Sequence, residues 1–308
     1  MKYGYFDNEN CEYVVEKPNT PTPWINYIGG GKYGGIVSNT GGGYSFDRDP
    51  KNKRILRYRY NSIPVDQPGR YIYLRDEETG TFWSATWQPT MTELDSYECR
   101  HGLGYTKIKS SCNNIDSEVV YFVPDNEEAL ELWVVKVKNK NSKAKKIKLF
   151  TYAEFSFYDS MKDQTNVDWC QQINQGTFEN GSIFWAAFMK TLGYTFFSTN
   201  AKVQSFDTDR EKFIGNYRSL ANPIAVETGK CSNSESLRGN GTGSLCVEIT
   251  LEPKEEKEVV FILGTAETPE KALPLIKKYR DMDVVKESLE SLKNPWTTYL
   301  GNQQVKTP

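Results

Sequence analysis

The side chains that most often carry out catalysis are scarce in this sequence. His101 is the only histidine among the 308 residues. A single imidazole can supply neither a pair of histidines for acid–base catalysis nor a metal site with three histidine ligands, so both arrangements are excluded. His101 lies in Glu98-Cys99-Arg100-His101-Gly102-Leu103-Gly104-Tyr105, and we predict that it makes structural hydrogen bonds rather than catalysing a reaction.

Metal and phosphate sites leave no signature in the sequence. The six cysteines are widely spaced and form no CxxC pair, and Asp207 and Asp209 lack the continuation of a calcium-binding loop. The glycine runs at 29–31 and 41–43 neither open a predicted helix nor carry the Lys-Ser/Thr of a nucleotide-binding loop, so we expect turns there. Carboxylates are common, but the sequence cannot place two of them at the separation that glycoside chemistry needs. We therefore predict no metal, no cofactor and no catalytic residue in this chain.

The charges of the chain nearly cancel, with 38 Lys and Arg against 40 Asp and Glu. No overall field would therefore attract nucleic acid or an anionic membrane. No apolar run approaches the roughly 18 residues of a membrane helix, and the start of the chain has no signal-peptide core. We expect a cytoplasmic protein with free thiols that binds neither nucleic acid nor membrane.

Most of the sequence consists of short alternating segments separated by Gly, Asn, Asp and Pro, which is the pattern of antiparallel strands. Residues 130–138 and 146–155 alternate on either side of a polar stretch, which predicts a hairpin. Residues 247–251 and 258–263 predict a second hairpin around a charged turn. Together these segments predict a mainly β protein built as an antiparallel sandwich.

The pattern changes after Gly264, where two helices are expected. Thr268 can cap the first helix, with Pro269 at its first helical position. Asp283 can cap a second helix, whose apolar residues repeat at i, i+4 and i+7. Pro295 then predicts the end of that helix and could begin another, since proline is tolerated in a first helical turn. An apolar helix face needs a surface to cover.

Motifs along most of the chain resemble one known family. They are Tyr3-Gly4-Tyr5-Phe6-Asp7, Thr22-Pro23-Trp24-Ile25-Asn26-Tyr27-Ile28-Gly29, Gly42-Gly43-Tyr44-Ser45-Phe46, Arg57-Tyr58-Arg59-Tyr60-Asn61, Gly69-Arg70-Tyr71 and Arg100-His101-Gly102-Leu103-Gly104-Tyr105. These stretches resemble the amino-terminal region of glycoside hydrolase family 94, the inverting disaccharide phosphorylases. Asp163-Gln164-Thr165-Asn166 looks cellobiose-type, whereas Gly229-Lys230-Cys231-Ser232-Asn233-Ser234 looks like the chitobiose enzyme. The motifs therefore leave the sugar class open.

The resemblance implies a fold as well as a family. It implies a galactose-mutarotase-like antiparallel β-supersandwich, followed by a short helical linker and then an (α/α)6 catalytic barrel. We therefore divide the chain into a supersandwich domain at residues 1–266 and a helical linker at residues 267–308. Residues 304–308 resemble the family's entry into the barrel, so we expect the barrel to lie outside this chain.

The resemblance also implies a reaction. In the family, an aspartic acid on the barrel protonates the glycosidic oxygen while inorganic phosphate attacks the anomeric carbon, which yields an α-sugar 1-phosphate. Phosphate would then be the co-substrate, a β-linked disaccharide the substrate, and the barrel a partner supplied in cis or in trans. Neither the acid nor the phosphate pocket is expected in this chain, which alone should be inactive.

Family members are typically homodimers in which the sandwich of one subunit can lend a loop to the active site of the other. The equivalent segment here is Tyr158 to Gln172, which interrupts the strand alternation. Its candidate substrate-edge or dimer-loop residues are Asp159, Asp163, Gln164, Asn166, Trp169 and Gln171. The alternative is an ordinary surface loop in which Trp169 packs against the sandwich.

Two other functions are considered. Aromatic residues make up 13% of the chain. They favour strand packing but also stack on sugar rings, so the alternative function is a stand-alone carbohydrate-binding β-sandwich. An aldose-epimerase-like enzyme is disfavoured, because that activity typically uses two histidines. The sequence leaves open which disaccharide is used, how many subunits assemble, and whether the chain is a fragment or one part of a split enzyme.

Overall fold

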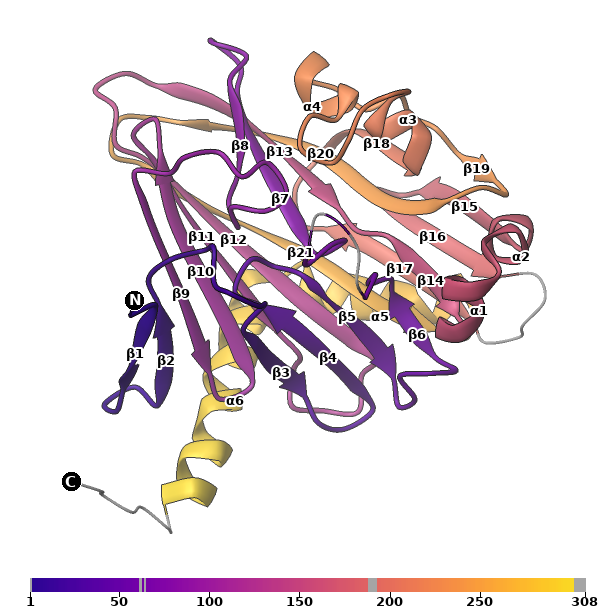
Figure 1. Ribbon diagram of the computed structural model, residues 1–308, viewed down its shortest axis with the longest axis horizontal. Helices are drawn as coiled ribbons and strands as arrows, with labels where there is room; N and C mark the ends of the chain where they lie inside the picture. Colours follow the sequence, from indigo (N-terminus) through magenta and orange to yellow (C-terminus); the bar gives the residue numbers. More distant parts are fainter. Residues whose placement is uncertain (1, 61–62, 64, 188–192, 302–308) are drawn as a thin grey trace.

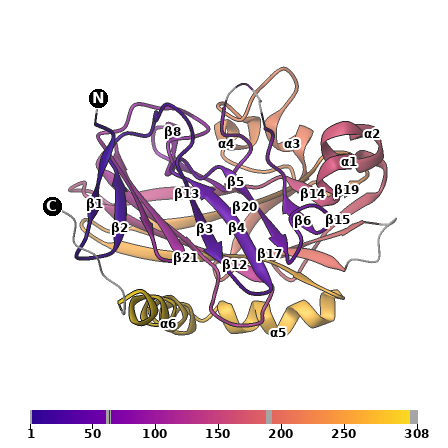
Figure 2. The ribbon, with the colours of Figure 1, turned by 60° about the horizontal axis from the view of Figure 1, so that its bottom comes forward.

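Figure 1 shows the computed structural model, which describes residues 2–60, 63, 65–187 and 193–301. Strands dominate these residues and form antiparallel sheets. The sheets stack as a sandwich, and helices cover part of both outer faces (Figures 1 and 2). The predicted mainly β, antiparallel sandwich is therefore confirmed.

The largest sheet, called the long sheet below, contains eleven strands within the described residues. Neighbouring strands pair antiparallel throughout it. In spatial order its strands are β1 (Gly4–Asp7), β2 (Glu12–Val15), β9 (Ser96–Gly102), β10 (Tyr105–Cys112), β11 (Ile115–Phe122), β12 (Leu130–Asn139), β21 (Glu256–Ala266), β17 (Tyr194–Thr199), β16 (Ser182–Ala187), β15 (Asn174–Glu179) and β19 (Ser236–Leu237).

Two shorter sheets face the long sheet. The second sheet consists of β18 (Val203–Asp209), β20 (Gly241–Leu251), β13 (Lys145–Tyr152), β7 (Tyr71–Asp76) and β8 (Phe82–Ser84). The third sheet consists of β14 (Phe155–Tyr158), β6 (Arg54–Leu56), β5 (Gly43–Asp47), β4 (Tyr33–Ser38) and β3 (Ile25–Gly29).

Strand β12 shows how the sequence fills the two sides of the long sheet. Trp133, Val135 and Val137 belong to the core between the sheets. Leu130 and Leu132, which point the other way, belong to a second apolar cluster on the outer face. Both faces of this strand are therefore apolar, because the outer face is covered by helices.

The two predicted hairpins are wrong. Strand β12 pairs with β11 and β21, whereas β13 pairs with β20 and β7. The links from β12 to β13 and from β20 to β21 therefore carry the chain from one sheet to the other. The alternating pattern predicted a buried face for each strand correctly, but it does not specify the partner strand.

Asn139 joins these two sheet crossings. Its buried side-chain amide donates hydrogen bonds to the carbonyl oxygens of Lys143, at 2.8 Å, and Leu251, at 3.1 Å. Its backbone exchanges hydrogen bonds with Lys254 and Glu255. The two crossings therefore form one corner, in which buried backbone groups are satisfied by a single side chain.

Two helices, α5 (Pro269–Tyr279) and α6 (Met282–Gly301), lie on the outer face of the long sheet (Figure 2). Ile276 of α5 and Leu292 of α6 share a buried cluster with Phe122, Leu132 and Ile262 of the sheet. Strand β21 ends at Ala266, but both helices pack on the same body. The division at residues 266 and 267 stays a prediction.

The expected start of α5 is confirmed, whereas the limits expected for α6 are wrong. Thr268 caps α5 by accepting a hydrogen bond from the backbone of Lys271. Asp283 lies inside the first turn of α6, where its N–H donates to Oδ1 of Asp281 at 2.9 Å. The helix also continues past Pro295 to Gly301. An internal proline removes one helical hydrogen bond but does not forbid the helix.

Four short helices complete the described structure. Helices α3 (Arg210–Ile214) and α4 (Ile224–Thr228) cover the outer face of the second sheet, where Phe213 and Val226 pack on Tyr73 and Tyr152. Helices α1 (Ser160–Thr165) and α2 (Val167–Gln172) follow β14 at the edge of the third sheet (Figure 1). Each helix within the described residues is too short or too polar to span a membrane.

Candidate functional site

The segment predicted as a loop from Tyr158 to Gln172 contains helices α1 and α2, and is called the α1–α2 segment below. Asp159 caps α1, because its Oδ1 accepts a hydrogen bond from the backbone of Lys162 at 3.0 Å. Asn166 caps α2 in the same way, with Oδ1 3.1 Å from the backbone nitrogen of Trp169. Side-chain acceptors at both helix starts explain why strand alternation fails here. Two of the six predicted site residues therefore act as helix caps.

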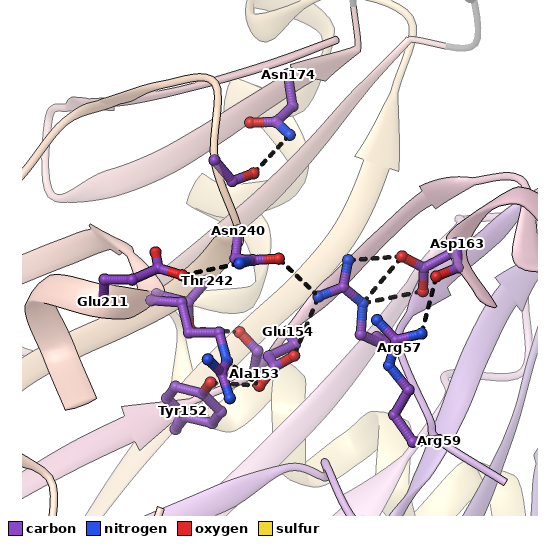
Figure 3. Close-up of polar contacts among 12 residues, drawn as sticks. Arg57, Arg59, Tyr152, Ala153, Glu154, Asp163, Asn174, Glu211, Asn240 and Thr242 are labelled. Carbon is purple, nitrogen blue, oxygen red and sulfur yellow. Dashed lines mark hydrogen bonds and ion pairs between the residues drawn. The ribbon is translucent and has the colours of Figure 1, made fainter. Parts of the chain in front are cut away.

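Asp163 points into the protein rather than towards solvent. Its carboxylate is buried and binds the guanidinium of Arg57 through two nitrogens (Figure 3). The Arg57 Nη2 to Asp163 Oδ1 distance is 2.6 Å, and Nε lies 2.9 Å from Oδ2. Nη1 of Arg59 donates to the backbone oxygen of Asp163 at 2.8 Å. Two arginines thus hold α1 by its side chain and its backbone.

Arg57 also reaches a second buried carboxylate. Its Nη1 donates to Oε2 of Glu154 at 3.2 Å, and Oε1 of Glu154 accepts from Nε of Arg210 at 2.9 Å. Burial opposes the charge of Glu154, but the Arg210 and Arg57 guanidinium groups outweigh it and hold the pKa of this carboxyl below its usual value. We call Arg57, Glu154, Asp163 and Arg210 the Arg57 network.

Local strand pairing positions this network. Strand β6 pairs with β14, and Leu56 lies opposite Phe155. The residues just beyond this pair are neighbours as well, since the N–H of Arg57 donates to the carbonyl of Glu154 at 2.8 Å. Strand β14 then leads directly into α1. The pairing of two short strands therefore places the guanidinium between Glu154 and Asp163.

The remaining predicted residues of the α1–α2 segment face outward or pack beside the sandwich. Gln164 is exposed, and so is the capping residue Asn166. Trp169 is half-buried, packs against the core between the sheets, and has Nζ of Lys162 4.4 Å from its ring centroid. Gln171 is half-buried, and its carbonyl accepts from the backbone of Gly239. The six residues thus share one segment but differ in orientation, and packing of Trp169 accords with the alternative prediction for it.

Arg57, Glu154 and Arg210 were not predicted as site residues. Arg57 and Asp163 are 106 positions apart, and Arg210 and Glu154 are 56 positions apart. No local pattern encodes such pairs. The available signal was Arg57-Tyr58-Arg59, in which two arginines alternate on an extended segment and so point to the same side.

His101 makes two hydrogen bonds within the sandwich. Nε2 lies 3.0 Å from the carbonyl oxygen of Trp24, and Nδ1 lies 3.0 Å from Oγ1 of Thr106. Because a carbonyl can only accept, Nε2 carries the proton and Nδ1 accepts from the hydroxyl. Burial lowers the pKa of His101 to about 4, against the opposing effect of the Trp24 hydrogen bond. These contacts support the structural role predicted for this residue.

The described residues contain no group of three His, Cys, Asp or Glu side chains placed to hold a metal ion. The arrangement of the Arg57 network is also unsuited to acid catalysis. Its two carboxylates are each bound to arginine, and the pKa of the Glu154 carboxyl is held below its usual value. What the network does is fix the α1–α2 segment on the sandwich.

Comparison with known proteins gives consistent results. The family model for the supersandwich domain of glycosyl hydrolase 94 matches residues 11–282. The N,N'-diacetylchitobiose phosphorylase of Vibrio furnissii is 38% identical over 100% of this chain. The 3-O-beta-D-glucopyranosyl-beta-D-glucuronide phosphorylase of Paenibacillus borealis is 31% identical over 99% of it. The chain spans 39% of the length of each of these two proteins.

A solved structure gives the same picture of the fold. The chain aligns with a putative kojibiose phosphorylase from the human microbiome with a TM-score of 0.53 and 12% sequence identity. The alignment covers 94% of this chain and 38% of that one. At this level of identity the likeness concerns the fold alone.

Proposed function

The chain belongs to glycosyl hydrolase family 94, and from this premise we propose that it forms the amino-terminal supersandwich and linker of an inverting β-disaccharide phosphorylase. The catalytic acid and the phosphate pocket belong to an (α/α)6 barrel supplied in cis or in trans. There inorganic phosphate attacks the anomeric carbon, and an α-sugar 1-phosphate leaves. The chain itself contributes shape and contacts rather than the acid. Two relatives whose names denote phosphorylases support this role.

The observation that carries the proposal is the Arg57 network beneath the α1–α2 segment. The bidentate contact from Arg57 to Asp163, with a closest distance of 2.6 Å, fixes a short helix that carries Gln164 on its exposed side. Binding residues work best when their supporting contacts hold them in place before the ligand arrives. In the homodimer that we propose, Gln164 and its neighbours then form an edge of the active site in the other subunit.

For the substrate, we propose a β-linked disaccharide of N-acetylglucosamine as the first compound to test. Support comes from the two diacetylchitobiose phosphorylases of Vibrio species, which are 38% and 37% identical to the whole chain. Cellobiose is the second compound, because Asp163-Gln164-Thr165-Asn166 resembles the cellobiose-type motif. We place the reaction in the cytoplasm, where phosphate is available as co-substrate.

A chimaera tests this function. The part of the Vibrio furnissii enzyme that aligns with this chain, 39% of its length, is replaced by this chain, and sugar 1-phosphate formation is measured. We expect phosphorolysis of diacetylchitobiose by the chimaera and none by the isolated chain. A folded, dimeric chimaera that is inactive on both disaccharides would contradict the proposal, as would phosphorolysis by the chain alone.

The same chimaera tests the α1–α2 edge. Gln164 is exposed on α1, and Gln204 is exposed on β18 in the second sheet, so the two form a matched pair of substitutions. We expect Gln164→Ala to raise KM for the disaccharide several-fold, and Gln204→Ala to leave it unchanged. Equal KM values in both variants would remove the α1–α2 segment from the active site while leaving the phosphorylase proposal intact.

A further inference from the structure

A cleft of about 520 Å³ lies on the outer face of the long sheet, beside the start of α5. Helix α5 packs on β21 and β17, and the sheet continues beyond these strands through β16 and β15. Figure 2 shows α5 on this outer face. The cleft therefore occupies the part of the face that lies next to the helix. The strand residues that line it and are used below are Gln175, Thr177, Glu179, Phe184, Ala186 and Tyr194.

Strand register places these side chains on one face of the sheet. Gln175 lies opposite Ala186, and Ala186 lies opposite Tyr194, so the three form a row across β15, β16 and β17. Thr177 lies opposite Phe184, two positions along the same strands. Phe184 belongs to the apolar cluster on the outer face, and Tyr194 packs against that cluster. Because residues two apart in a strand share a face, all five side chains point into the cleft from the same side.

A small residue in the middle of this row creates the hollow. Ala186 stands between two long side chains, Gln175 and Tyr194. Neighbouring strands are about 4.8 Å apart, so the backbones of these two residues are about 10 Å apart, with only a methyl group between them. The Ala186 methyl group and the Tyr194 ring give the hollow an apolar surface, which the C–H face of a pyranose can cover.

The polar groups around the hollow are free to bind a ligand. The Gln175 amide, the Thr177 hydroxyl and the Tyr194 hydroxyl form no side-chain hydrogen bond with any residue that the structure describes. Each of these groups can both donate and accept a hydrogen bond. A sugar hydroxyl has the same double capacity, whereas a phosphate needs donors and an ammonium group needs acceptors. The set of polar groups therefore fits a ligand rich in hydroxyls.

The charge of the cleft disfavours anionic ligands. Two carboxylates line it, those of Glu179 and Glu267, and its described lining residues include no Lys, Arg or His. Glu267 is paired with Lys271, whose hydrogen bond lowers the pKa of this carboxyl. Glu179 forms no ion pair within the described part of the chain, so its charge is uncompensated. A sugar phosphate is therefore repelled, whereas an uncharged sugar can donate a hydroxyl hydrogen to Glu179.

We propose that this cleft is a binding site for one or two pyranose units of an uncharged saccharide. Tyr194 and Ala186 contact the apolar face of the sugar ring, and Gln175, Thr177 and Glu179 bind its hydroxyls. The site does not depend on the phosphorylase reaction, and it uses no residue of the α1–α2 segment.

Titration calorimetry with the purified chain tests the site. The ligands are diacetylchitobiose, cellobiose and glucose 1-phosphate. Ala186→Leu fills the hollow, Gln175→Ala removes one hydrogen-bonding group, and Gln204→Ala removes the same group from an exposed position on β18. We expect binding of at least one neutral disaccharide and no binding of glucose 1-phosphate. The affinity should be at least tenfold lower in Ala186→Leu, about fivefold lower in Gln175→Ala and unchanged in Gln204→Ala.

Three results would overturn the proposal. They are the absence of heat with both neutral disaccharides, equal affinities in Gln175→Ala and Gln204→Ala, and binding of glucose 1-phosphate as strong as that of the disaccharides. Thermal unfolding of Gln175→Ala should match the parent chain, so this variant decides the matter even if Ala186→Leu is destabilised. Saccharide binding that is lost in Gln164→Ala but kept in Gln175→Ala would place the sugar at the α1–α2 segment instead.

Discussion

Arg57 binds the carboxylate of Asp163 through two nitrogens, with distances of 2.6 Å and 2.9 Å, although 106 residues separate the two in sequence. Both side chains are almost completely buried. Their contact links the sandwich to α1, which carries one of the predicted substrate-edge residues, Gln164, on its exposed side.

Arg57→Leu should destabilise the protein by about 3–5 kcal/mol, because it leaves the Asp163 carboxylate buried without its cation. Adding Asp163→Leu should recover part of this loss, since the unpaired charge is then removed as well. Urea unfolding measures both effects. Lys271→Ala, which breaks an exposed pair with Glu267, is the control and should change nothing measurable. Equal unfolding midpoints for Arg57→Leu and Lys271→Ala would show that the buried pair does not hold the fold.

The lowered pKa of His101 predicts a loss of stability in acid. Its pKa is about 4 in the folded protein, against about 6.5 in an unfolded chain. As the pH falls, His101 therefore binds a proton in the unfolded chain before it does so in the folded protein. Its contribution to stability is complete above pH 6.5 and declines as the pH falls towards 4. His101→Gln should flatten this decline in urea unfolding measured between pH 7 and 4.5. As the only histidine, His101 also gives a single set of imidazole NMR signals, which should not titrate above pH 5.

Asp66 predicts the opposite dependence of stability on pH from that of His101. Its carboxylate is buried and accepts from the hydroxyls of Ser38, Thr40 and Tyr58, and no ion pair is formed with it within the described part of the chain. Burial raises its pKa, against these hydrogen bonds. The contribution of Asp66 to stability is then complete below its pKa in the unfolded chain, about 3.9. It is lost as the pH rises through its pKa in the folded protein. The difference in unfolding free energy between Asp66→Asn and the parent should therefore shift in favour of the variant from pH 4 to 7. A difference independent of pH would contradict the raised pKa.

Gly42 has no room for a side chain, because a Cβ there would lie 2.2 Å from Oδ1 of Asp66. Gly42→Ala should therefore cost about 1–3 kcal/mol through overpacking. Gly30 provides the control, since a Cβ at that position meets nothing within 4 Å. Thermal unfolding of the two alanine variants should separate them clearly, and coincident curves would show that the loop around Asp66 can move aside.

Ile276 tests whether α5 is part of the sandwich body. It is 2% exposed and packs in the cluster on the outer face of the long sheet. Ile276→Ala should cost about 2–5 kcal/mol in urea unfolding. Leu273, in the same helix and 45% exposed, should cost little when changed to Ala. A small effect at both positions would indicate that the linker helix unfolds separately from the strands.

The features that were predicted correctly are those encoded locally. Thr268 followed by Pro269 marks the start of α5, because capping involves only neighbouring residues. The alternation at 130–138 gave the buried face of β12, but its partner β21 lies more than a hundred residues away. The α1–α2 segment was located by its interrupted alternation, yet the inward direction of Asp163 depends on Arg57. Contacts between residues far apart in the sequence determine the partner strand of β12 and the direction of Asp163. A short sequence pattern does not encode such contacts.

The corner at which Asn139 joins the two sheet crossings has a consequence for how the chain folds. Asn139 bonds to Leu251 across 112 residues. Strand β13 cannot pair with β20 until nearly all of these residues have been synthesised, and β12 cannot pair with β21 until all of them have been. Assembly of the sandwich is therefore a late and slow event governed by long-range contacts. Until then the nascent chain carries open strand edges, at which it can pair with other chains and aggregate.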